Sequence, residues 1–367
     1  MNLKIKYQFK IISFMENVLF LITTTGKCNL RCDYCGGSFD PALVPYNIKY
    51  DIKKLIEFLN RFEKKTVVFY GGEPLLNFKF IEEFFKYDIG KVRTGIQTNG
   101  TLIRNFNEEF WKNFDFALLS IDGNRDITDI HRGSGVYDKV ISGAEYLKSM
   151  KIETIARMAI SHDNDIFRSV NHLINTGLFD KIHWQLDVIW DIPWDVKLWA
   201  DKSYLPGIDK LLDIFIENIE KNRILKIVPF LGILNSYYFS KFEHVPCGAG
   251  KRSFTINSDG RILACPIAVN EHWSILGNLN GVFSEFSEKL ECHGCDYFPY
   301  CGGRCLYAYK ERFWGEEGFR NVCYITQKTV DSVLSRADSI KKILERNNMK
   351  IEDLKYDPTE DSTEIIP

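Results

Sequence analysis

Short apolar runs alternate with amphipathic segments along the first half of the chain. Residues 18–24 (VLFLITT) form a continuous apolar run, which predicts a strand buried on both faces. Further strands are predicted at 66–70, 92–98, 116–121, 152–160 and 182–190. Helices with apolar residues on one side are predicted between them, at 52–62, 78–85, 107–113, 136–150 and 166–177. This alternation indicates an α/β fold with a parallel sheet, and six units predict a partial (β/α)6 barrel of TIM type. Its chemistry would then lie at the C-terminal ends of the strands.

The pattern changes after residue 200. An amphipathic helix is predicted at 207–222, and residues 247–323 are rich in Gly and Cys with few long periodic segments. A small Cys-rich domain therefore follows the barrel. The predicted organisation is an N-terminal arm (1–15), a barrel core (16–200), a bridging helical segment (201–246), the Cys-rich domain (247–330), a C-terminal helix (331–354) built around 330–347, and a flexible tail (355–367).

Composition limits the compartment and the partners. The 47 Lys and Arg nearly balance 49 Asp and Glu, so charge gives no case for binding nucleic acid or an anionic membrane. No run reaches the 18–20 uncharged residues of a membrane span, and the basic, apolar first residues lack a cleavage site. The prediction is a cytoplasmic protein, where thiols stay reduced. Its ten cysteines must then be metal ligands, nucleophiles or inert core thiols.

Three of the cysteines directly follow the first predicted strand. Cys28, Cys32 and Cys35 lie in GKCNLRCDYC, on a loop at the expected mouth of the barrel. Three thiolates on one short loop can bind three irons of a [4Fe–4S] cluster and leave the fourth iron open. The alternative is a zinc site, but structural zinc usually has four ligands and no His lies nearby.

This loop resembles the signature of the radical S-adenosylmethionine (SAM) superfamily, Cys-x3-Cys-x-aromatic-Cys, with Tyr34 in the aromatic place. The resemblance implies that the open iron chelates SAM. It also implies that one electron from the cluster cleaves SAM to a 5′-deoxyadenosyl radical, which abstracts a substrate hydrogen. The cofactor would supply the difficult chemistry, and the protein would orient it and exclude water.

The ends of later strands also resemble SAM-binding segments of this family. Glu73 would accept a hydrogen bond from the SAM ammonium, and Arg157 would lie near the SAM carboxylate. Arg157 could instead form an internal ion pair, and Asn99 and Asp122 could be turn residues. Besides Tyr34, the residues that the resemblance assigns to cofactor binding are Gly71, Gly72, Glu73, Pro74, Asn99, Ser120, Asp122 and Arg157.

The other seven cysteines have the spacing of a second family module. From Cys247 to Cys323 the gaps resemble the SPASM extension, which holds two auxiliary [4Fe–4S] clusters. The resemblance implies one group of Cys292, Cys295, Cys301 and Cys323 and an inner group of Cys247, Cys265 and Cys305. No cysteine remains for the fourth iron of the inner cluster. A predicted hairpin at 255–264 delivers Cys265, and Gly302 and Gly303 let backbone amides approach the sulfurs. The alternative for this module is a pair of zinc sites.

The resemblance indicates an enzyme that oxidatively modifies a peptide or protein, with a thioether or other crosslink as the specific hypothesis. Alternatives are a small-molecule oxidoreductase, a sulfatase-maturing enzyme and a zinc-stabilised interaction protein. Pro266 stands where the sulfatase branch carries Asp. Expected partners are an electron donor such as ferredoxin or flavodoxin and a separate leader-peptide-binding protein, because only 27 residues precede Cys28.

Asp187 is the candidate catalytic residue, as proton acceptor or substrate anchor. It shares one face of the sixth predicted strand with His183 and Gln185, and that face could also be a polar layer of the barrel. Trp190, Trp194 and Trp199 either line a substrate cleft or cover apolar surface beneath the Cys-rich domain.

Overall fold

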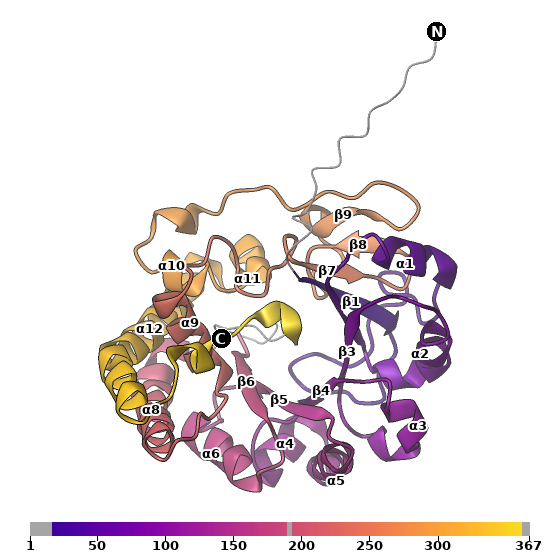
Figure 1. Cartoon of the computed structure of the whole chain (residues 1–367). Coiled ribbons are helices and arrows are strands. Elements are labelled where there is room, and N and C mark those ends of the chain that lie inside the picture. Colours follow the sequence, from indigo (N-terminus) through magenta and orange to yellow (C-terminus); the bar gives the residue numbers. More distant parts are fainter. Residues whose placement is uncertain (1–16, 189–192, 362–367) are drawn as a thin grey trace.

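The computed structural model describes residues 17–188 and 193–361, so the N-terminal arm, Trp190 and residues 362–367 lie outside the described residues. Six parallel strands lie side by side in chain order and curve into an open barrel with helices outside it (Figure 1). They are β1 (Val18–Thr25), β2 (Lys65–Gly71), β3 (Val92–Thr98), β4 (Phe116–Ser120), β5 (Glu153–Ile160) and β6 (Lys181–Leu186). The structure confirms the predicted α/β partial barrel.

The first strand shows why apolar runs become barrel strands. All eight residues of β1 are buried. Phe20 belongs to the large core between the sheet and the helices, whereas Leu19 and Leu21 pack with Val68 in a separate cluster inside the barrel. A strand covered on both faces needs apolar residues at successive positions, which explains the unbroken run.

Helices follow most of the strands. Five of them begin after a polar residue whose side chain accepts a hydrogen bond from a backbone amide of the first turn: Asp51, Asn107, Asn124, Asp165 and Asp195. The helices around the barrel are α1 (Ile52–Leu59), α2 (Phe78–Phe84), α3 (Glu108–Trp111), α4 (Arg125–Arg132), α5 (Val136–Ser149) and α6 (Ile166–Thr176). They are followed by α7 (Val196–Trp199), α8 (Leu205–Glu220) and α9 (Val228–Tyr238).

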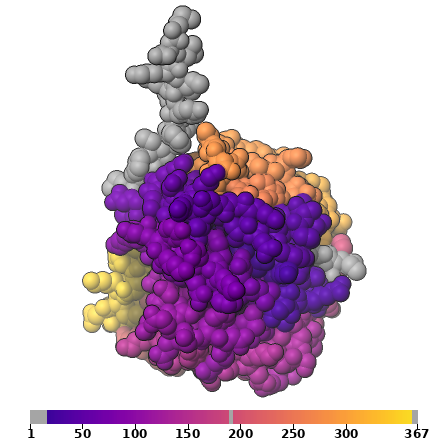
Figure 2. Space-filling view, turned by 90° about the vertical axis from the view of Figure 1, so that its right-hand side faces the viewer, coloured from indigo at the N-terminus to yellow at the C-terminus, as the bar shows by residue number. Residues whose placement is uncertain are grey.

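The sheet continues into the Cys-rich domain. Strands β7 (Ser253–Ile256) and β8 (Arg261–Leu263) form the predicted antiparallel hairpin, and β9 (Ile275–Asn278) extends it. The sequence did not predict that β7 pairs in parallel with β1, which makes one nine-stranded sheet. Figure 2 shows the result, with the orange segment seated against the indigo elements of the barrel.

The Cys-rich domain adds two short helices and a long one. Its own apolar cluster contains eight buried residues. Helix α12 begins well before the predicted start at 330, because Val322 and Ile325 continue its buried face, so Cys323 lies on a helix. In the described part of the chain, no helix is long and apolar enough to cross a membrane. The three helices are α10 (Phe298–Cys301), α11 (Leu306–Glu311) and α12 (Gly315–Arg346).

Residues 355–361 pack against the barrel, although the sequence predicts a flexible tail there. Asp361 is fully buried, and its carboxylate lies 2.5 Å from the ammonium of Lys181 on β6. Tyr356 donates a hydrogen bond to the same carboxylate over 2.9 Å. A buried lysine needs a counter-charge. The ion pair between Lys181 and Asp361 therefore holds this segment across the barrel (Figure 1).

Candidate functional site

A cavity of about 860 Å³ lies at the C-terminal ends of the barrel strands, where the barrel meets the Cys-rich domain. Its wall brings together cysteines that are far apart in the sequence. Those that line it are Cys28, Cys32, Cys35, Cys247, Cys265 and Cys305. The candidate SAM-cluster cysteines and the candidate inner-cluster cysteines therefore share one cavity.

The loop after β1 is folded by its own short hydrogen bonds. The amides of Cys35 and Gly36 donate to the carbonyl of Cys32, over 3.2 and 2.9 Å. A hydrogen bond between the Cys32 and Cys35 thiols lowers the pKa of Cys35 to about 6 and raises the pKa of Cys32. One thiolate is therefore favoured in the metal-free loop, and thiolates are the form that binds iron.

The exit of β2 is pressed against this loop. The Gly72 amide donates to the Thr25 carbonyl over 3.0 Å, and the Glu73 amide donates to the Lys27 carbonyl over 2.8 Å. A Cβ on Gly72 would lie only 2.3 Å from the Lys27 carbonyl oxygen. The glycine at this position is thus required for the close approach of two backbones.

Glu73 lies behind the cavity wall and not on it, as does Pro74. Its carboxylate accepts hydrogen bonds from Leu75, Thr98 and the amide of Asn99, over 3.1, 2.8 and 2.8 Å. Burial raises the pKa of Glu73 to about 7, although these three bonds favour the charged form. In this geometry the Glu73 carboxylate positions Asn99, and its contact with the SAM ammonium stays a prediction.

Asn99 reaches from the end of β3 to the cysteine loop. Its side-chain amide donates to Asn29 over 2.8 Å and lies 3.8 Å from the sulfur of Cys28. Asn99 lines the cavity, as do Gly71, Gly72 and Ser120. These residues remain candidates for contacts to SAM.

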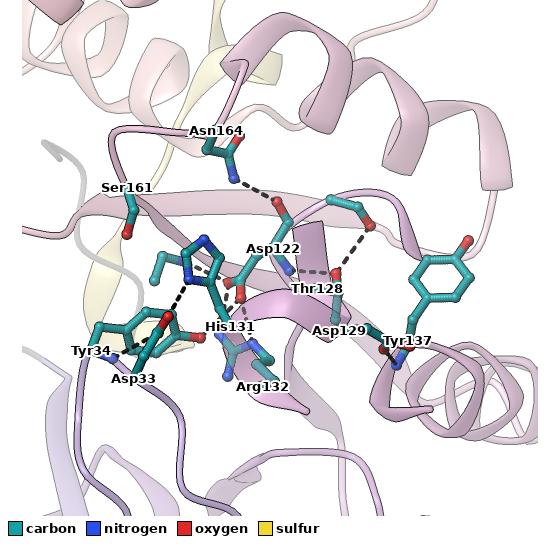
Figure 3. Close-up of polar contacts among 12 residues, drawn as sticks. Asp33, Tyr34, Asp122, Thr128, Asp129, His131, Arg132, Tyr137, Ser161 and Asn164 are labelled. Carbon is teal, nitrogen blue, oxygen red and sulfur yellow. Dashed lines mark hydrogen bonds and ion pairs between the residues drawn. The ribbon is translucent and has the colours of Figure 1, made fainter. Parts of the chain in front are cut away.

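Asp122 is fully buried and points to protein partners instead of the cavity (Figure 3). It accepts two hydrogen bonds from the Arg132 guanidinium, each 2.7 Å long, and a third from the Tyr34 hydroxyl over 2.9 Å. Burial and the Asp122 carboxylate raise the pKa of Tyr34 well above its ordinary value, although the Arg132 charge opposes this rise. Both Tyr34 and Arg132 line the cavity, so Asp122 orients two cavity residues.

Sequence reasoning missed Arg132 and its neighbour His131. His131 lies 2.7 Å from Asp33 through Nδ1 (Figure 3). It also lies 3.0 Å from Asp163 through Nε2. These contacts join α4 to the cysteine loop. The sequence signal that could have identified them was the helix after Asp122. The C-terminal residues of that helix return to the mouth of the barrel.

Arg157 lines the cavity on β5, in register with Ser120 on β4. Its guanidinium donates to His183 over 3.2 Å and to Gln185 over 2.9 Å. Asp187, just after β6, also lines the cavity and accepts a hydrogen bond from Ser161 over 2.8 Å.

The remaining four cysteines lie away from this cavity. Cys292, Cys295, Cys301 and Cys323 interact electrostatically with one another. Burial raises the pKa of Cys301 to about 11, and a hydrogen bond from the Gly303 amide opposes this rise. The predicted approach of a backbone amide to a sulfur therefore occurs at Cys301.

The donors suit iron–sulfur clusters by residue type. In the described residues no three Cys, His, Asp or Glu side chains already converge as a metal site. The fit therefore rests on the donor set: three thiols on one loop at the cavity, three on the facing domain, and four grouped outside it. Thiolates in sets of three or four are the usual ligands of such clusters.

The tryptophans around the exit of β6 form an apolar support. Trp194 packs against Trp199 and Trp314, with ring centroids 5.2 and 5.9 Å apart. Trp194 and Trp199 join the main core and do not line the cavity, whereas Trp314 does. The covering role is the one that the structure favours for Trp194 and Trp199.

The curated proteins to which this chain is similar have names that state different activities or none. The chain is 27% identical over 315 residues to an uncharacterized protein of Archaeoglobus fulgidus, covering 77% of this chain and 73% of the relative. It is 21% identical over 328 residues to the radical SAM cyclopropyl synthase TigE of Paramaledivibacter caminithermalis, covering 80% and 68%. It is 26% identical over 242 residues to a GTP 3′,8-cyclase of Thermodesulfovibrio yellowstonii, covering 59% and 68%.

Solved structures share the fold. One is native anSMEcpe with bound AdoMet and Cp18Cys peptide, with a TM-score of 0.68, 20% identity, and coverage of 89% of this chain and 100% of that one. Another is Streptococcus suis SuiB bound to precursor peptide SuiA, with a TM-score of 0.55, 14% identity, and coverage of 79% and 72%. Residues 22–170 match the family model of the Radical SAM superfamily, and the chain therefore contains a radical SAM superfamily domain.

Proposed function

We propose that this protein reductively cleaves SAM and uses the resulting radical to oxidise a peptide or protein substrate. The observation that carries the proposal is the shared cavity, whose wall holds two separate sets of three cysteines together with Arg157 and Asp187. A site of this kind suits an enzyme that makes a radical on one side and handles the substrate on the other.

Residues of the barrel would hold the cofactor. Cys28, Cys32 and Cys35 would bind a [4Fe–4S] cluster, and Asn99, Ser120 and Arg157 would contact SAM. Cluster and SAM together would supply a 5′-deoxyadenosyl radical. Arg157 suits the SAM carboxylate because its planar fork can make two parallel hydrogen bonds. Asp187 would accept a proton from the substrate or anchor it.

The Cys-rich domain would hold two auxiliary [4Fe–4S] clusters. The inner one has three candidate ligands, Cys247, Cys265 and Cys305, and an iron without a fourth thiolate could bind a substrate thiol. Metal binding would lower the pKa of that thiol and fix its position, which supports a thioether crosslink as the product. The alternative is a cap of water or protein at this iron, with the cluster relaying electrons.

The peptide class has support from the named neighbours. Solved structures with this fold contain a Cp18Cys peptide and the precursor peptide SuiA. The electron donor would be a ferredoxin or flavodoxin, and a separate protein would bind the leader. A small-molecule substrate is the second candidate, because a GTP 3′,8-cyclase is among the relatives. Pro266, which lines the cavity beside Cys265, argues against a sulfatase substrate.

The test is reductive formation of 5′-deoxyadenosine by anaerobically reconstituted protein. The wild type should bind about twelve irons, from three clusters, and should release 5′-deoxyadenosine. Changing Cys28, Cys32 and Cys35 together to Ala should remove about four irons and abolish the product. Product formation by that variant would refute the assignment, and a protein that binds zinc but no iron would indicate an interaction protein.

A further inference from the structure

We propose that Arg132 sets the reduction potential of the cluster held by Cys28, Cys32 and Cys35, and that Asp122 limits this effect. The inference rests on the proposed function, because it requires a cluster on this loop. It assigns a charge-tuning role to a residue pair that does not itself bind iron. Arg132 and Asp122 are therefore positioning and tuning residues in this account.

The pair is buried and rigid. Arg132 is 8% exposed, and Asp122 is fully buried. The two 2.7 Å hydrogen bonds between them use Nε and one terminal nitrogen of the guanidinium, so the charges are held in a fixed fork (Figure 3). Asp122 also accepts from the amide of Ala159 on β5 over 2.8 Å, which fixes the carboxylate to the sheet.

The guanidinium faces the cysteine loop. It lies 5.3 Å from the ring centroid of Tyr34, which stands between Cys32 and Cys35 in the sequence. Its charge interacts with both of these thiols. Arg132 lines the cavity with the three cysteines, whereas Asp122 lies behind the wall. The cation is thus the member of the pair that is presented to the cluster.

Electrostatics then gives the direction of each effect. Reduction adds one electron from a low-potential donor, and no bond to Arg132 forms or breaks. The added negative charge is stabilised by a nearby buried cation, so Arg132 should raise the reduction potential. Asp122 partly cancels that cation and should lower the potential. Loss of Arg132 should therefore lower the reduction potential, and loss of Asp122 should raise it.

The nearest alternative is a purely structural role. Arg132 and His131 are adjacent at the end of α4, and the His131 carbonyl accepts a hydrogen bond from the Asp33 amide over 3.2 Å. Removing either member of the Asp122–Arg132 pair could simply loosen the loop. A loosened loop would shift the reduction potential in the same direction in both variants. The charge effect would shift it in opposite directions, and this difference separates the two roles.

The experiment is an EPR redox titration of the reconstituted holoenzyme, following the cluster signal that changes when SAM is added. Arg132→Gln should shift its midpoint to a more negative potential, and Asp122→Asn to a more positive one. Arg132→Lys, which keeps the charge, should stay near the wild type. Arg125→Gln is the matched control, because this exposed arginine of α4 pairs with Asp138.

The outcomes separate the two proposals. A wild type without a SAM-sensitive cluster signal refutes the proposed function. A normal signal with midpoints that shift together, or no further than in Arg125→Gln, overturns the role of Arg132 alone. If the two uncharged variants do not fold, Tyr34→Phe replaces them. It removes the hydrogen bond that partly neutralises Asp122, so a negative shift is expected and an unchanged midpoint contradicts the proposal.

Discussion

The barrel and the Cys-rich domain differ in the interactions that are expected to stabilise them. The barrel strands are buried on both faces and share a continuous apolar core with the surrounding helices. The Cys-rich domain has a separate cluster of eight buried apolar residues and seven cysteines between Cys247 and Cys323, while Phe254 and Ile256 of β7 join the core of the barrel. Small apolar cores rarely support a fold without metals or disulfides. We therefore expect packing to maintain the barrel and metal ligation to contribute to the stability of the added domain.

The two sets of cysteines at the cavity are also held in place by different elements. The loop with Cys28, Cys32 and Cys35 is held by the exits of β2 and β3 and by α4. Cys265 follows the β7–β8 hairpin, which is anchored through the pairing of β7 with β1. In the outer group, Cys301 and Cys323 lie on helices α10 and α12 and not on a strand. The hairpin should therefore be the most persistent part of the Cys-rich domain.

The largest expected effect comes from removing iron. Chelation of the reconstituted protein should greatly increase amide hydrogen exchange around Cys292, Cys295 and Cys301, because ligation energy would be lost there. Strands β1 to β5 should keep their protection. Equal protection of the outer group with and without iron would contradict the comparison.

A smaller effect is expected at the base of the barrel. Asp361→Ala leaves the Lys181 ammonium with Glu153 as its other carboxylate partner, 3.0 Å away. Loss of one buried partner should lower the free energy of unfolding by up to about 3–5 kcal/mol, measured by denaturant titration. Lys86→Ala removes an exposed pair with Glu83 and should leave the free energy of unfolding nearly unchanged. Similar losses in both variants would show that the C-terminal segment does not support the barrel.

The smallest expected effect concerns SAM affinity. Arg157→Ala should weaken SAM binding about 10- to 100-fold by calorimetry, because a charged hydrogen bond contributes about 1.5–3 kcal/mol. Arg168→Ala on the exposed side of α6 is the control, and its affinity should equal that of the wild type. An unchanged dissociation constant for Arg157→Ala, with the fold intact, would make this arginine structural.

The sequence predicted the elements whose structure is determined by residues close together in the chain. Apolar runs located the six barrel strands, and the position of Cys28 after the first run placed its loop at the mouth. Asp259 and Gly260 located the hairpin that precedes Cys265. In each case the residues that decide the structure are neighbours in the chain.

Contacts between distant residues could not be predicted in this way. The pairing of β7 with β1 depends on backbone groups more than 200 residues apart, and Asp361 meets Lys181 across 180 residues. The resemblance assigned Glu73 and Asp122 to cofactor binding, and the structure adds that their carboxylates accept hydrogen bonds from protein donors. A side chain's direction depends on which donors the fold brings near it, and sequence spacing does not reveal them.

The most direct test of the division between barrel and added domain is 5′-deoxyadenosine formation by a variant with Cys247, Cys265 and Cys305 changed to Ala. The account predicts a loss of about four irons, continued reductive SAM cleavage and no modified peptide. A variant that retains its outer cluster and its SAM-sensitive EPR signal but no longer cleaves SAM would contradict it. The radical would then depend on the inner cluster and not on the barrel alone.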